Sequence, residues 1–121
     1  MNIILFSRKQ VIHRPEQLSK MLNALTRLGV DYTINEDFAQ DIEQLLQTTI
    51  EPSHRFVGAI EAKGDDVVVT FGGDGTLLEA VGLLPNYNIP VVGVNCGRLG
   101  YLTVDDGSGV EELMERIVQC Q

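Results

Sequence analysis

Five consecutive residues, Gly72-Gly73-Asp74-Gly75-Thr76, combine the residue type best suited to bind phosphate with one acidic side chain. Glycine lacks the Cβ atom that would keep a phosphate group away from the backbone, and successive backbone N–H groups can surround its oxygens. A helix that begins in the loop would add the positive end of its dipole. The loop therefore predicts a binding site for an anion.

Asp74 is the unexpected residue of this loop, because a carboxylate in an anion-binding turn is electrostatically unfavourable. Three roles would justify its presence. It would accept a proton from a hydroxyl group that attacks phosphorus, hold Mg²⁺ beside the phosphates, or accept a hydrogen bond from a ribose. The loop residues are compatible with all three roles.

The residues around the loop indicate how it is positioned. Val67–Phe71 reads as a buried strand, and the apolar residues between Leu77 and Leu84 have helical spacing. A loop between such a strand and helix lies at the carboxyl edge of a parallel sheet, where open α/β sheets bind ligands. An Asp-Gly hairpin would need a strand after the loop. A strand-to-helix turn without a ligand is the other structural interpretation.

Two familiar phosphate-binding loops are excluded by the residues that follow. No Gly-Lys-Ser/Thr comes after Gly75, so the loop is not a Walker A motif, and Leu78 stands where the dinucleotide fingerprint requires its last glycine.

The remaining sequence predicts alternating strands and helices in one domain, residues 1–121. Further strands are expected at 2–6, 30–34 and 89–94, and residues 50–63 are irregular, with a short strand or turn at 56–60. Helices are expected from Pro15 to a Gly29 cap, after Asp37, and after a Ser108 capping box. The second helix should bury the following stripe: Phe38, Ile42, Leu45 and Leu46.

Composition narrows the classes of partner. The net charge is −8, and residues 61–121 hold three Lys or Arg against ten Asp or Glu, so nucleic acid is not expected as a partner. No apolar run is long enough for a membrane span or a signal peptide, so we expect a cytoplasmic protein. Cys96 and Cys120 lack zinc-site spacing, and His13 and His54 are expected at the surface or in packing.

Two segments together resemble the amino-terminal domain of the NAD kinases. They are Val-Val-Thr-Phe-Gly-Gly-Asp-Gly-Thr-Leu-Leu at 68–78 and Pro-Val-Val-Gly-Val-Asn-Cys-Gly-Arg-Leu-Gly-Tyr-Leu-Thr at 90–103. Phosphofructokinases and the diacylglycerol and sphingosine kinases share the first segment, whereas the second is similar to NAD kinases in particular. The order of elements also matches, which implies a three-layer, Rossmann-like parallel sheet with helices on both faces.

The resemblance implies phosphoryl transfer from ATP or polyphosphate to the 2′-hydroxyl of the adenosine ribose of NAD, with Mg²⁺ or another divalent metal, giving NADP. It implies that Asp74 is the general base. Arg8 and Lys9 follow the first strand at the same sheet edge and are candidates for the ATP phosphates, with a solvated turn as the alternative. The expected binding residues are Gly72, Gly73, Asp74, Gly75, Thr76, Asn95, Gly97, Arg98 and Arg8.

NAD kinases are longer and carry a second, largely β domain, so we expect this chain to be a fragment with weak or no activity alone. The full-length protein is expected to be a homo-oligomer. The alternatives are another kinase with this loop, of the phosphofructokinase or lipid kinase type, and a non-catalytic nucleotide sensor. A receiver-type signalling module would need acidic residues after the first strand, where Ser7, Arg8 and Lys9 stand instead.

Overall fold

A computed structural model describes residues 1–9, 11–85, 88–95 and 108–119. Five strands form one sheet in the order β3-β2-β1-β4-β5, and all four pairings are parallel. The strands are β1 (Asn2–Ser7), β2 (Asp31–Asn35), β3 (Arg55–Phe56), β4 (Val67–Gly72) and β5 (Val91–Asn95). The predicted parallel α/β sheet is confirmed.

Both faces of the sheet are buried, which explains why its central strands are apolar at nearly every position. On β1, Ile3 and Leu5 belong to the larger apolar cluster, and Ile4 and Phe6 belong to a smaller one on the opposite face. This separation follows from the alternation of side chains along a strand.

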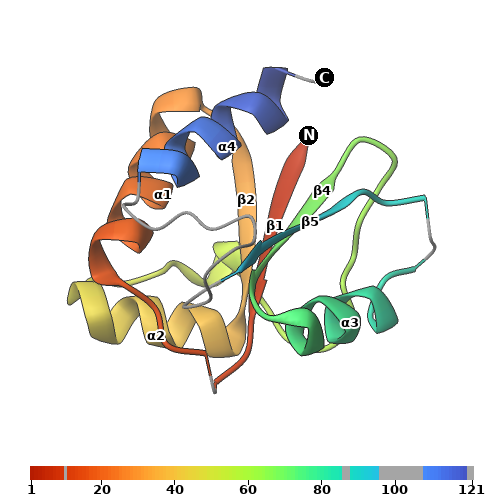
Figure 1. The fold of residues 1–121 in the computed structure, drawn as a ribbon, viewed down its shortest axis with the longest axis horizontal. Helices are drawn as coiled ribbons and strands as arrows, with labels where there is room; N and C mark the ends of the chain where they lie inside the picture. The colour runs from red at the N-terminus through yellow and green to blue at the C-terminus, as the bar shows by residue number, and fades with distance from the viewer. Residues whose placement is uncertain (10, 86–87, 96–107, 120–121) are drawn as a thin grey trace.

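Within the described residues, helices cover both faces of the sheet (Figure 1). On one face lie α1 (Pro15–Leu28), α2 (Glu36–Leu46) and α4 (Ser108–Gln119), and on the other lies α3 (Asp74–Gly82). A short 3₁₀ helix, η1 (Pro52–His54), precedes β3. The predicted three-layer arrangement is therefore correct. Within the described ranges, no helix combines the length and apolar character needed to cross a bilayer.

The first helix begins and ends where its sequence predicts. Pro15 occupies its first turn, and Gly29 follows it with a φ of 68°, donating its N–H to the carbonyls of Leu25 and Thr26. Glycine adopts this left-handed conformation without the steric penalty that a Cβ atom would bring.

One predicted core position is wrong, because Leu45 of α2 is 40% exposed. In α3, Leu78 is 70% exposed. Helix α3 instead buries Thr76 and Ala80, which lie four residues apart on one face. Residues 50–63, where a short strand or turn was expected at 56–60, contain η1 and then β3 at 55–56.

Candidate functional site at the centre of the sheet edge

The candidate site lies where the chain reverses its direction of winding. β1 and β4 are neighbours, with Ser7 opposite Phe71, yet the helices that follow these strands cover opposite faces of the sheet. In doubly wound α/β folds the loops diverge at this point, and ligands bind between them. The two loops here begin with Arg8 and Gly72.

The glycine loop is exposed to solvent. Gly72 is the last residue of β4, Gly73 precedes α3, and Asp74 is the first residue of that helix. Gly73, Asp74 and Gly75 are exposed, whereas Gly72 and Thr76 are buried beneath them. A ligand can therefore approach the loop without displacing packed side chains.

Packing requires glycine at one position of the loop and not at the next. A Cβ atom on Gly72 would lie 2.4 Å from Thr76 Oγ1, so the close packing of this turn requires glycine. A Cβ atom on Gly73 would meet nothing within 4 Å, and the residue has a φ of −107°, which any residue can adopt. Packing and conformation thus give no reason for glycine at position 73.

Helix α3 begins without a capping side chain. The first N–H groups of a helix have no partners within the helix, and the helix dipole places partial positive charge there. Among the described residues, the Asp74 carboxylate makes no ion pair or hydrogen bond. The loop thus offers free backbone donors next to an unengaged carboxylate.

The structure brings Arg8 to this loop from the neighbouring strand. A Cβ atom on Gly75 would lie 3.1 Å from Arg8 Nη1, so the guanidinium lies directly over the first turn of α3. The same nitrogen lies 3.6 Å from Glu79 Oε1, and the Arg8 side chain is 35% exposed. A second positive charge therefore lies beside the helix terminus.

The structure describes only some of the predicted site residues of the second motif. Asn95 ends β5, and its backbone lies in register with Gly72, so the motif begins beside the glycine loop. Gly97 and Arg98 lie outside the described residues. Lys9, the other predicted cation after β1, lies 3.9 Å from Asp37 of α2.

A buried polar network behind the loop was not foreseen from the sequence. Ser7 Oγ donates to the carbonyl of Phe71 at 2.7 Å and lies 3.0 Å from His13 Nε2. His13, expected at the surface or in packing, is buried and stacks on Phe38 with ring centroids 4.7 Å apart. Burial lowers its pKa to about 4, so the ring is neutral at physiological pH. The sequence signal that could have revealed this network is the presence of polar residues at the ends of apolar strands.

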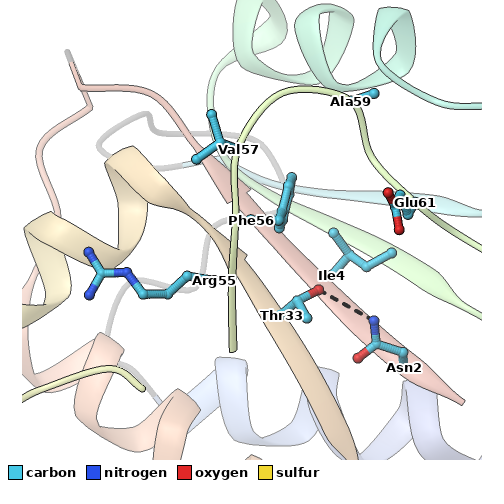
Figure 2. Close-up of a pocket in the computed structure, with 8 residues that line it drawn as sticks. All are labelled: Asn2, Ile4, Thr33, Arg55, Phe56, Val57, Ala59 and Glu61. Atoms are coloured by element: carbon cyan, nitrogen blue, oxygen red, sulfur yellow. Dashed lines mark hydrogen bonds between the residues drawn. The ribbon is translucent and has the colours of Figure 1, made fainter. Parts of the chain in front are cut away.

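A cavity of about 340 Å³ lies elsewhere, beside the β3 edge (Figure 2). Its wall includes Asn2, whose amide donates to Thr33 Oγ1 at 3.3 Å, and Arg55, whose guanidinium contacts two carboxylates. No predicted site residue lines this cavity. The cavity is lined in part by residues of β1, β2 and β3, whereas the glycine loop follows β4.

Comparison with known proteins agrees with this geometry. A family model described as the ATP-NAD kinase N-terminal domain matches residues 2–121. A protein named NAD kinase from Marinomonas sp. is 33% identical over 115 residues, which cover 93% of this chain and 39% of that protein. Proteins of the same name from Methanothermobacter thermautotrophicus and Christiangramia forsetii are 27% and 29% identical, over 98% and 86% of this chain.

The chain spans only 35% to 39% of the length of these relatives. The match nevertheless covers the sheet, the glycine loop and all four helices. The chain thus belongs to the ATP-NAD kinase family, of which it carries the amino-terminal domain.

Proposed function

We propose that this domain takes part in transferring the γ-phosphoryl group of ATP, or the terminal phosphoryl group of polyphosphate, to the 2′-hydroxyl of the adenosine ribose of NAD. The observation that carries the proposal is the position of Asp74. Its carboxylate, which has no partner among the described residues, lies at the exposed start of α3 beside N–H groups without a side-chain cap. The Arg8 guanidinium lies over the same turn of the helix.

The proposed reaction uses each of these groups. The 2′-hydroxyl gives its proton to the Asp74 carboxylate while its oxygen forms a bond to phosphorus. The bond between that phosphorus and the bridging oxygen breaks, and ADP leaves with the electron pair. Phosphoryl transfer depends mainly on positioning and charge neutralisation, which the backbone amides and Arg8 supply.

A divalent metal fits this arrangement as an ion held mostly by its substrate. Among the described residues, no group of three or more His, Cys, Asp or Glu side chains surrounds a possible ion. Mg²⁺ commonly binds through one or two carboxylates together with substrate phosphates. Substrate phosphates would supply most of its ligands, and the ion would neutralise charge on the phosphates.

The binding residues are proposed on the same basis. Gly73 and Gly75 would give the phosphates and the dinucleotide close access to the backbone, Asn95 would contact substrate beside Gly72, and Arg8 would neutralise phosphate charge. We further propose that catalysis needs the second domain that the curated relatives have the length to contain, and that this chain alone binds nucleotide weakly.

The test is an assay of NADP formation by the chain extended through its downstream sequence. Asp74→Asn should lower kcat by about 10²- to 10⁴-fold, because a positioned general base contributes about that much. The control is Asp31→Asn, which changes an exposed carboxylate at the start of β2 and should leave kcat unchanged.

Two results would count against the proposal. Failure of the extended wild type to form NADP with either donor would refute NAD kinase activity. Wild-type kcat in Asp74→Asn would refute the general-base role alone.

A further inference from the structure

Ser7 joins the ends of three strands. Its hydroxyl donates to the Phe71 carbonyl at 2.7 Å, immediately before Gly72. Its backbone N–H donates to Asn35 Oδ1 at 2.9 Å, and its carbonyl accepts from Asn35 Nδ2 at 2.8 Å. Ser7 is 1% exposed, so these bonds form away from water. The position of the glycine loop therefore depends on a residue of β1.

The hydrogen bonds of Ser7 determine the tautomer of His13. A serine hydroxyl carries one proton, and here that proton is donated to the Phe71 carbonyl. Ser7 Oγ must then accept a hydrogen bond from His13 Nε2, 3.0 Å away, which places the imidazole proton on Nε2. His13 Nδ1 is left without a proton, and among the described residues it is the buried side-chain polar atom without a hydrogen-bond partner.

His13 also closes the segment that carries Arg8. Ser7 and His13 stand at the two ends of this segment, and Val11 N–H donates to the Arg8 carbonyl at 3.1 Å within it. A Cβ atom on Gly72 would lie 3.1 Å from Val11 Cγ2, so the segment lies against the start of the glycine loop. The bond between Ser7 and His13 thus fixes two loops at once.

The His13 ring is held from its other side by aromatic packing. Phe38 of α2 stacks on it, and Phe38 in turn contacts Phe71, with ring centroids 5.3 Å apart. Stacking on Phe38 is thus a contact of the ring that is distinct from its hydrogen bond to Ser7. This separation of packing from hydrogen bonding makes the two contributions testable independently.

We propose that Ser7 and His13 are positioning residues, whose hydrogen bond sets the place of Arg8 relative to the glycine loop and so the geometry of the phosphate site. The inference rests on the proposed function, because that function assigns Arg8 to the phosphates of the donor. A purely structural pair would affect the stability of the fold and leave the Michaelis constants unchanged.

Three variants of the extended protein test the pair. His13→Phe keeps a ring that can stack on Phe38 and removes the N–H donor. His13→Gln returns an amide N–H near the position of Nε2, and Ser7→Ala removes the acceptor. His13→Phe and Ser7→Ala should raise KM for ATP about tenfold, the loss expected for one buried hydrogen bond. KM for NAD should change less than about twofold, and His13→Gln should recover most of the ATP affinity.

A spectroscopic measurement tests the geometry without reference to activity. Nitrogen-15 NMR of the imidazole should show a protonated Nε2 and an unprotonated Nδ1 in the wild type. A protonated Nδ1 would overturn the inferred hydrogen bond. If His13→Phe fails to fold, Ser7→Ala carries the same kinetic test.

The outcomes separate this inference from the proposed function. Unchanged KM for ATP in folded His13→Phe and Ser7→Ala would overturn the positioning role and leave NAD kinase activity standing. If the wild type forms no NADP, the proposed function fails, and calorimetric titration with ATP decides the inference. Equal ATP affinity in wild type and Ser7→Ala would then refute it, and weaker affinity in the variant would support it.

Discussion

Two arginines of this domain each follow or begin a strand at the same edge of the sheet, yet their surroundings differ. Arg55, in β3, bonds Glu36 through Nε and Nη2, Glu43 through Nη1 at 2.8 Å, and the Ile50 carbonyl at 3.2 Å. Among the described residues, Arg8, which follows β1, has one ion-pair contact, of 3.6 Å to Glu79. The Arg55 side chain is 18% exposed and that of Arg8 is 35% exposed.

The difference separates a structural arginine from one available to a ligand. A guanidinium has five N–H donors, and those of Arg55 are largely used by the protein itself. Among the described residues, those of Arg8 make no hydrogen bond, and the guanidinium lies beside the start of α3. The Arg55 cluster, residues 36, 43, 50 and 55, should therefore determine stability, and the switch-point loops should determine binding.

The largest expected effect is a difference in pH dependence between the two regions. His13 has its pKa lowered by burial from 6.5 to about 4, so as the pH falls the unfolded chain binds the proton first. This contribution to the free energy of unfolding is complete above pH 6.5 and is lost as the pH falls towards 4, amounting to about 3 kcal/mol.

The Arg55 cluster should lose stability in a lower pH window. Hydrogen bonding from Arg55 holds the pKa of Glu36 below its ordinary value of 4.5, so its contribution is present above pH 4.5 and is lost below it. Urea unfolding at several pH values would measure both windows. His13→Gln should flatten the upper window and Glu36→Gln the lower one, and an unchanged profile in either variant would break the comparison.

The second prediction contrasts two adjacent glycines. Gly72→Ala places a methyl group against Thr76 and should lower the free energy of unfolding by about 1–3 kcal/mol, together with ATP affinity. Gly73→Ala has open space and should keep its stability, while ATP binds about tenfold or more weakly because the methyl group blocks the backbone. Thermal unfolding and calorimetry separate the two effects, and normal ATP affinity in Gly73→Ala would contradict the site.

The third prediction exchanges the roles of the arginines. Arg8→Ala should raise KM for ATP about tenfold, because a charged hydrogen-bond donor is lost, and should leave the unfolding midpoint unchanged. Arg55→Ala should lower the midpoint and leave KM unchanged, because two carboxylates lose their partner. Kinetics and thermal unfolding of both variants make the measurement. A lower midpoint in Arg8→Ala would show that both arginines are structural.

The smallest effect is expected at Glu79. Its contact with Arg8 is long and its side chain is 51% exposed, so the ion pair contributes little. Glu79→Gln should change KM for ATP by less than about fivefold, as steady-state kinetics would show. A larger change would mean that Glu79 holds Arg8 in place, and the two arginines would then differ less than the structure indicates.

The strands and the glycine loop could be predicted because their signals are local. A buried parallel strand is an apolar run, and the loop between Phe71 and Leu77 is marked by its own residues. Arg8 meets Gly75 because the strand order places β1 beside β4. The two strands are far apart in the sequence, since β1 ends at Ser7 and β4 begins at Val67. Sequence order alone does not give this adjacency.

Other features escaped prediction because they depend on tertiary packing. His13 is buried because it contacts both Phe38 of α2 and Ser7 of β1. The sequence spacing between His13 and these two residues does not predict either contact. Helical periodicity placed Leu45 in the core, whereas the folded helix leaves this side chain 40% exposed. The role of Asp74 as a base remains a prediction.

Because α3 begins without a side-chain cap, a phosphate bound at its start would act as the cap of this helix. Phosphate oxygens would accept hydrogen bonds from the same N–H groups that donate to a serine or aspartate cap in other helices. Binding should therefore raise the melting temperature, and condensed phosphates should protect the fold more than monophosphate does. Simple inorganic salts could thus be ranked as ligands by a thermal-shift screen, before any substrate is synthesised.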